Sequence, residues 1–147
     1  MDIPLKVRIP ICIEQGSVFN FLVDFDDTKR QSKNRYFVIL NRNPKTDRVL
    51  VLITSTTQIL KRREYLIRMG ISEKTLVEVS VGEYSVFRSD SAFNCNEVFE
   101  VDMSDLIRKV EDGGSMGYPK MPDSILLRLI DGVKDSPIVT EEVKGLL

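Results

Sequence analysis

The chain has 147 residues, of which 42% are hydrophobic and 29% charged, and its net charge is −1. This composition is typical of a soluble globular protein, and the length predicts one domain. The near-neutral charge excludes the overall basic field of a non-specific DNA-binding protein. The sequence contains no histidine, which excludes a His-ligated metal site and a Ser or Cys nucleophile activated by His.

The N-terminal segment and the two cysteines indicate the cellular compartment in which the protein is expected. Residues 1–15 carry mixed charges and two prolines, which is not the pattern of a signal peptide. No apolar run approaches the about 18 residues that span a membrane. We therefore expect a cytoplasmic protein without a membrane partner, built as one domain over residues 1–147 with residues 1–15 as a candidate N-terminal extension. Cys12 and Cys95 are too few for a zinc site, and we expect two reduced, buried thiols.

Strands dominate the first half of the chain. Residues 6–13 alternate weakly and predict an edge strand, because Pro10 has no amide to donate to a central ladder. An aromatic and β-branched run comes next, and two further apolar runs follow a polar loop. The elements expected here are strands at 6–13, 17–25, 35–41 and 49–55, a loop at 26–34 and a helix at 56–69.

Shorter strands and two helices are expected in the second half. The amphipathic pattern of residues 123–133 predicts a helix, with Asp123 or Ser124 as its N-cap and Gly132 at its end. The strands do not alternate regularly with long helices, which argues against a parallel α/β sheet. The pattern predicts a β-rich α+β fold, a compact barrel or curled sheet with helical decoration. The elements expected here are strands at 75–81, 84–87 and 95–101, a short helix at 106–110, a loop at 113–122 and the C-terminal helix at 123–133.

Residues 35–58 predict a β-hairpin whose open end is polar. If residues 44–47 form a four-residue turn, antiparallel pairing places Arg35 opposite Thr56. A slip of one residue in either direction would still place a hydroxyl group opposite the arginine. Because side chains alternate between the faces of a strand, Thr54 and Thr56 share one face. The guanidinium group of Arg35 and a cluster of hydroxyl groups are therefore expected to converge.

A guanidinium next to a hydroxyl suits a phosphate or a developing oxyanion. Arginine keeps its charge and presents a planar fork of donors, and threonine adds a directional hydrogen bond. RNA cleavage by the 2′-hydroxyl requires that the sugar and the phosphate be positioned and the transition state stabilised, which needs no histidine. The same residues also fit a structural role, since arginine commonly begins a strand in solvent and Thr or Ser caps the helix that follows.

Several motifs follow one another within residues 16–58. Gly16 precedes an aromatic strand, and VDFDDTKRQ follows at 23–31. A strand opened by Arg35 comes next, and a second strand ends in ITSTTQ at 53–58. In order and approximate spacing, this segment resembles the MazF/PemK family of toxin endoribonucleases, with VDFDDTK as the most specific part.

The resemblance implies an SH3-like barrel, usually a homodimer, that cleaves single-stranded RNA with some sequence selectivity and is inhibited by a cognate antitoxin. It implies no metal and no cofactor. Arg35 corresponds to the catalytic arginine of the family and Thr56 to its catalytic threonine, whereas a match anchored on Ile-Thr selects Thr54 instead. The residues then expected to bind RNA are Lys29, Arg30, Gln31, Lys33 and Gln58.

The chain departs from the pattern of the family at several positions. Tyr36 stands where the family usually has proline after the arginine, and Asp27 and Arg30 replace a proline and a glycine of the loop. A helical segment follows Gln58 where many relatives turn directly into the next strand. Two alternatives therefore stay open: a catalytically inactive barrel that binds protein or RNA, and a structural or phage-related protein.

Three other groups are open to a binding or a structural interpretation. The cations at 61–63 suit phosphate contacts or the solvated face of a helix. Tyr118 suits base stacking or the filling of a loop. Asp24, Asp26 and Asp27 suit a metal ion, although an aspartate at the start of a turn is the commoner arrangement.

Overall fold

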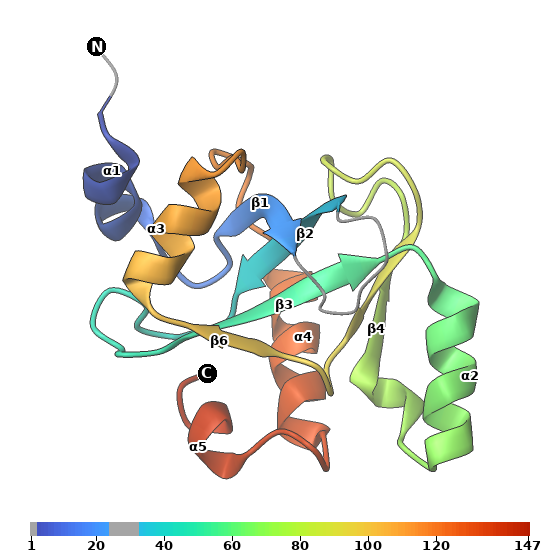
Figure 1. Cartoon of the computed structure of the whole chain (residues 1–147). Coiled ribbons are helices and arrows are strands. Elements are labelled where there is room, and N and C mark those ends of the chain that lie inside the picture. Colours follow the sequence, from blue (N-terminus) through green and yellow to red (C-terminus); the bar gives the residue numbers. More distant parts are fainter. Residues whose placement is uncertain (1–2, 24–32) are drawn as a thin grey trace.

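The computed structural model describes residues 3–23 and 33–147. In this part of the chain, six antiparallel strands form one sheet, and helices pack on both of its faces (Figure 1). The strands are β1 (Val18–Val23), β2 (Lys33–Ile39), β3 (Leu50–Thr56), β4 (Leu76–Val79), β5 (Ser91–Asn94) and β6 (Phe99–Val101). The helices are α1 (Leu5–Cys12), α2 (Ile59–Met69), α3 (Met103–Glu111), α4 (Asp123–Asp135) and α5 (Glu141–Lys144), and a 3-10 turn, η1 (Glu73–Thr75), precedes β4.

The sheet is open in the described residues. Its order is β1-β2-β3-β5-β4, and β6 pairs with β3. No pairing joins the outer strands β1 and β4 in the part of the chain that the structure describes. The predicted α+β class with an antiparallel sheet is confirmed, whereas closure into an SH3-like barrel stays a prediction.

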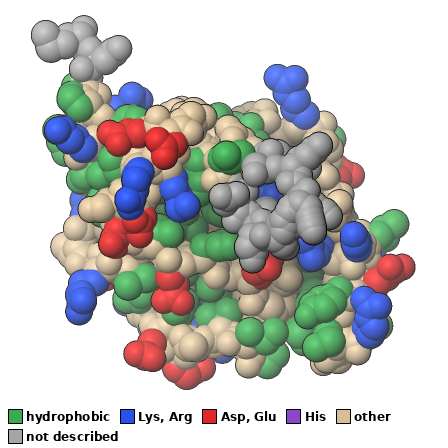
Figure 2. All heavy atoms as spheres, viewed as in Figure 1, with side chains coloured by type: hydrophobic (Ala, Val, Ile, Leu, Met, Phe, Trp, Pro, Cys, Tyr) green, Lys and Arg blue, Asp and Glu red, His purple; other side chains and the backbone are tan. Residues whose placement is uncertain are grey.

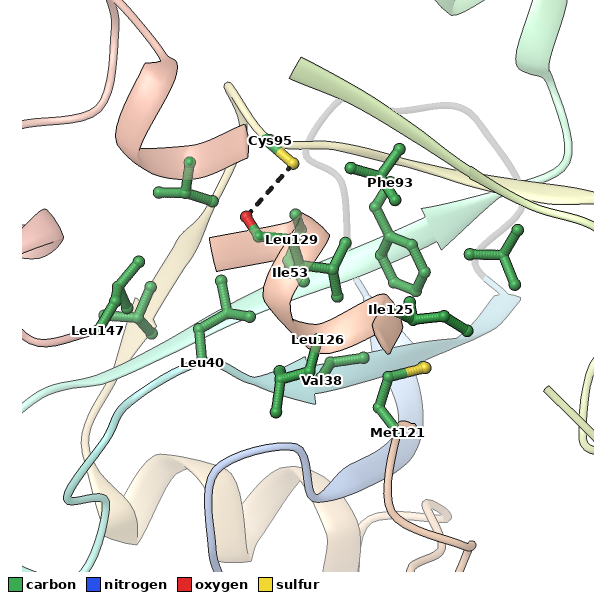
Figure 3. Close-up of a cluster of buried hydrophobic side chains, with 14 of the residues drawn as sticks. Val38, Leu40, Ile53, Phe93, Cys95, Met121, Ile125, Leu126, Leu129 and Leu147 are labelled. Atoms are coloured by element: carbon green, nitrogen blue, oxygen red, sulfur yellow. Dashed lines mark hydrogen bonds between the residues drawn. The ribbon is translucent and has the colours of Figure 1, made fainter. Parts of the chain in front are cut away.

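Alternation along β2 and β3 supplies a hydrophobic core to each face of the sheet. Val38 and Ile53 point to one face, where they pack with Leu129 of α4 (Figure 3). Phe37 and Leu52 point to the other face, whose core also contains residues of α1 and α3. Because consecutive side chains of a strand point to opposite faces, both strands must be apolar almost throughout. Polar residues can therefore stand only at the start of β2 and the end of β3, which lie together at the open end of the hairpin.

Residues 6–13 form a helix and a short continuation, so the predicted edge strand is wrong. Ile9 and Ile13 are both buried in the core that α1 shares with α3. The sequence KVRIPICI alternates weakly, but it also spaces these two isoleucines four positions apart, which is one face of a helix. Pro10 lies inside α1, where it leaves one helical hydrogen bond unmade.

The strands predicted after β4 differ from those observed. Residues 84–87 form turns, and the Tyr84 hydroxyl donates to the carbonyl oxygen of Pro119 at 2.6 Å. The single strand predicted at 95–101 is wrong, because β5 ends before it and β6 occupies only its last residues. The turn between them is closed by the Asn94 side chain, which accepts a backbone amide at 3.1 Å. The short helix around 106–110 and the loop at 113–122 are confirmed.

The C-terminal helix begins where the sequence predicts and ends later. The N-cap position of α4 is Pro122 without a side-chain hydrogen bond, so neither Asp123 nor Ser124 caps the helix. The helix also continues through Gly132 to Asp135, two residues past the predicted end at 133.

The second helix covers the edge of the sheet formed by β4 and β5. Leu66 of α2 is fully buried and packs with Leu76 and Ala92. The helix begins at Ile59, later than predicted, because Thr56 still belongs to β3. Gln58, at the N-cap position, makes no side-chain capping hydrogen bond.

The two thiols lie in different surroundings. Cys95 is buried as predicted, whereas Cys12 is exposed, so the prediction is wrong for Cys12. Burial raises the pKa of the Cys95 thiol to about 12. Its sulfur lies 3.7 Å from the carbonyl oxygen of Leu129 (Figure 3).

Gly132→Ala tests the contact between α4 and the turn that follows β5. A Cβ atom at Gly132 would lie 2.6 Å from Sγ of Cys95 and 3.1 Å from its Cβ. We expect the substitution to lower the free energy of unfolding by about 1–3 kcal/mol, because an overfilled core must distort. At a solvent-exposed position of a helix, the same substitution would raise the free energy of unfolding by about 1 kcal/mol. Urea denaturation measures the difference, and the loss should shrink in a Cys95→Ala background. An unchanged loss there would show that Cys95 is not the obstacle.

Candidate functional site

The hairpin of β2 and β3 has the predicted register, and its strands separate at the polar end. Phe37 pairs with Thr54, and the same register continued by two residues places Arg35 opposite Thr56. Before that point the strands diverge: β2 stays paired with β1 as far as Lys33, whereas β3 pairs with β5 as far as Thr56. A gap therefore opens between the two strands (Figure 1).

A cavity of about 290 Å³ lies at this gap. Its walls come from the start of β2, from the end of β3 with the segment before α2, and from residues 86–91 between β4 and β5. In the part of the chain that the structure describes, no carboxylate lines it. The lining includes Arg35, Tyr36, Thr56, Gln58, Phe87 and Arg88.

Arg35 is half-buried in the wall of the cavity. Its Nη1 donates to the carbonyl oxygen of Ser55 across the gap, at 3.5 Å. Burial lowers the pKa of Arg35, the positive charge of Arg62 lowers it further, and Glu97 opposes both. An arginine nevertheless stays protonated in proteins. The cavity therefore holds a fixed positive charge where partial exclusion of water strengthens electrostatic interactions.

The structure separates the two candidate threonines. Thr54 Oγ1 donates to the carbonyl oxygen of Tyr36 at 2.9 Å, which engages its only hydroxyl proton within the hairpin. Thr56 Oγ1 accepts the amide of Gln58 at 3.1 Å, and this bond leaves the hydroxyl proton of Thr56 for another acceptor. Thr56 lines the cavity, and Thr54 is not among the lining residues. The geometry thus favours Thr56 as the residue that meets a ligand together with Arg35.

The loop of residues 80–90 brings side chains to the cavity that the sequence did not indicate. Phe87 and Arg88 are the main ones, and Arg88 is exposed. Within the loop, the carboxylates of Glu83 and Asp90 accept backbone amides at 2.8 and 2.7 Å, which fixes its shape. The segment SVFRSDS carries no signal for a site, because it reaches the cavity only once β5 has paired beside the end of β3.

Aromatic rings close one side of the cavity. The ring centroids of Tyr36 and Phe87 lie 5.6 Å apart. Tyr118 meets Tyr36 edge to face, with centroids 5.4 Å apart, and its hydroxyl bonds with that of Ser115. The loop-filling interpretation of Tyr118 is therefore favoured over a role in stacking with a base.

Part of the predicted ligand-binding set lies outside the described residues. Lys33 is described only as the first residue of β2, and Gln58 lines the cavity. Among the described residues, no three His, Cys, Asp or Glu side chains gather as metal ligands would, and no helix there is long and apolar enough to cross a membrane. The predicted residues outside the described ranges are Asp24, Asp26, Asp27, Lys29, Arg30 and Gln31.

Comparisons with known proteins bear on the fold. No protein-family model matches the chain, and no curated protein does. Among solved structures, the chain is similar to the crystal structure of MazE-MazF from Deinococcus radiodurans, with a TM-score of 0.51 and 10% sequence identity. The alignment covers 92% of this chain and 98% of that chain. At this level of identity the likeness shows the fold, and the chain has a MazF-like α+β fold.

Proposed function

We propose that this chain is a cytoplasmic toxin of the MazF/PemK type, which cleaves single-stranded RNA in the cavity between β2 and β3 without a metal ion. The observation that carries the proposal is the meeting of Arg35 and Thr56 in one cavity whose described lining holds no carboxylate. A phosphodiester is an anion, so fixed positive charge without negative charge favours it. The MazF-like fold supports the same family, in which the sheet would serve as an SH3-like barrel.

In the proposed reaction, the 2′-oxygen of one ribose attacks the adjacent phosphorus. The bond from phosphorus to the 5′-oxygen of the next nucleotide breaks, which leaves a 2′,3′-cyclic phosphate and a 5′-hydroxyl. The 2′-hydroxyl loses its proton to water, and the leaving oxygen takes one from water. Arg35 neutralises the charge that develops on the non-bridging oxygens. The Thr56 hydroxyl donates to the reacting group and holds ribose and phosphate in line.

The proposal includes RNA selectivity, an antitoxin and a homodimer. Selectivity would come from the wall of the cavity that Tyr36, Phe87 and Arg88 form, since a base next to the cleaved phosphate would contact these side chains. The similar solved structure is a MazE-MazF complex, which supports a protein partner for this chain. A partner seated in the cavity would inhibit by competing with RNA for Arg35 and Arg88.

Incubation with end-labelled single-stranded RNA in the presence of EDTA tests the proposal. We expect fragments that end in a 2′,3′-cyclic phosphate and begin with a 5′-hydroxyl. An RNA of the same sequence with 2′-O-methyl groups should stay intact, because its 2′-oxygen cannot attack. Fragments with a 5′-phosphate, or cleavage that requires a divalent metal, would contradict the proposed chemistry.

A second candidate is a binding module that uses the same cavity without chemistry. One observation favours it: the described lining holds no carboxylate and the chain has no histidine, so the described residues of the cavity offer neither common general base for the 2′-proton. Such a protein would shift single-stranded RNA on a native gel and leave it intact on a denaturing gel. The two gels, run on one sample, separate the candidates.

A further inference from the structure

The second helix carries a basic face that the cavity does not account for. α2 turns Leu66 and Arg63 toward β4 and β5, since Leu66 is buried there and Arg63 forms an ion pair with Glu78. Of the cations at 61–63, Arg63 therefore has a structural role. Residues three and four apart on a helix are neighbours, so another side of α2 gathers a different set. We call this set the outer face of α2: Lys61, Arg62, Tyr65, Arg68 and Met69. Glu64, three residues after Lys61 and four before Arg68, lies at the edge of this face and is the carboxylate of the helix.

The outer face of α2 is accessible and carries excess positive charge. The exposed fraction is 42% for Tyr65 and 56% for Met69. Among the described residues, Lys61, Arg62 and Arg68 enter no ion pair. Figure 2 shows basic, hydrophobic and acidic side chains next to one another on the right of the view, where α2 lies. This concentration of cations is local, because the whole chain has a net charge of −1.

The outer face of α2 begins where the cavity ends. Gln58 lines the cavity and directly precedes the helix. One turn later, Arg62 lies close enough to Arg35 for its charge to lower the pKa of that residue, and Glu97 offsets only part of the shift. The cations of the cavity and of the helix thus form one surface that suits an extended polyanion.

We propose that the outer face of α2 continues the RNA-binding path out of the cavity. The strand would leave Arg35 and Thr56 along the helix, with its phosphates on Lys61, Arg62 and Arg68 and one base stacked on Tyr65. This inference rests on the proposed function only for its choice of RNA as the ligand. It assigns binding, and no part of the cleavage step, to α2.

Single-stranded RNA fits this face better than an acidic protein segment does. Cations spaced around an exposed aromatic ring match a strand that offers phosphates and flat bases together. An acidic peptide would match the charges but would make no comparable use of Tyr65. The outer face of α2 is also continuous with the cavity, so one RNA strand could contact both surfaces. This continuity favours RNA over an acidic peptide.

Binding of 2′-O-methyl RNA tests the inference without cleavage. The variant Lys61→Gln/Arg62→Gln/Arg68→Gln keeps good helix formers on α2, and its melting temperature checks the fold. For an RNA of about ten nucleotides, we expect the slope of log K against log salt to become shallower by about 2, since each phosphate contact contributes about 0.7. Affinity should fall about tenfold or more, while the affinity for a dinucleotide stays unchanged. Tyr65→Ala should weaken the longer RNA by about tenfold, and Tyr65→Phe should not.

A variant of equal charge provides the control. Lys45, Arg48 and Lys134 are exposed and lie outside α2 and the lining of the cavity, and their triple replacement by glutamine should leave slope and affinity as in wild type. Wild-type slope and affinity in the α2 variant would overturn the inference and leave the proposed function standing. Binding that behaves as expected in a protein that cleaves nothing would support the inference and sink the proposed function.

Two further outcomes decide between ligands. If the wild-type chain binds no single-stranded RNA, this result contradicts both the inference and the choice of RNA as the ligand. A poly-glutamate peptide serves as the probe for an acidic protein partner. If the α2 variant loses the peptide but keeps the RNA, the outer face of α2 binds protein and the inference is overturned.

Discussion

Arg35→Ala is expected to lower the rate of single-stranded RNA cleavage by about 10²- to 10³-fold, the usual loss when one donor to a developing oxyanion is removed. Arg35 is the half-buried cation of the cavity, and its Nη1 already reaches across the gap to Ser55. Arg35→Lys should restore only part of the rate, because lysine lacks the planar fork of donors. Single-turnover cleavage of a labelled RNA measures both variants.

Arg108→Ala is the matched control for that experiment. Arg108 is exposed on α3 and forms an ion pair with Asp105, away from the lining of the cavity. Its loss should leave the rate of cleavage unchanged. A folded Arg35→Ala protein that cleaves as fast as wild type would remove Arg35 from the reaction, and thermal unfolding shows whether the variant is folded.

Thr56→Val is expected to lower the rate of cleavage, whereas Thr54→Val is expected to lower the free energy of unfolding. Valine keeps the shape of Thr56 without the hydroxyl, so cleavage should slow by about 10²-fold with little change in the free energy of unfolding. Thr54→Val should cleave at the wild-type rate but lose about 1 kcal/mol of the free energy of unfolding, because the carbonyl oxygen of Tyr36 loses its donor. Cleavage rates and urea denaturation of both variants provide the comparison.

Thr56→Ser keeps the hydroxyl and controls for the change of residue. It should retain most of the cleavage activity. The opposite pattern, with activity lost in Thr54→Val and kept in Thr56→Val, would identify Thr54 as the residue that meets the phosphate and would make the assignment of Thr56 wrong.

The register of the hairpin could be predicted because two constraints agree. The turn fixes it from one side, and the structure closes that turn with a hydrogen bond from the amide of Asp47 to the carbonyl of Asn43. The apolar runs of the two strands are the second constraint on the register. A slip of one residue would turn side chains to the wrong face of the sheet, whereas the observed register buries Phe37 in one core and Ile53 in the other. Placing Arg35 near Thr56 needed nothing beyond these local facts.

The first helix and the loop of residues 80–90 could not be predicted, for a different reason. The sequence around α1 satisfies the spacing of a strand and that of a helix, and only packing against α3 decides between them. Arg88 reaches the cavity because β5 pairs beside Thr56, a contact between segments far apart in the chain. Local sequence patterns carry no information on contacts between distant segments. The wall of the cavity that residues 86–91 form depends on such contacts.

A double-mutant cycle between Arg35→Ala and Thr56→Val tests most directly whether the two side chains act on one phosphate. Residues that act as a unit lose activity in a non-additive way, whereas independent residues multiply their losses. We predict that the double variant cleaves single-stranded RNA about as fast as Arg35→Ala alone. A rate lowered by the full product of the two single losses would contradict a shared site.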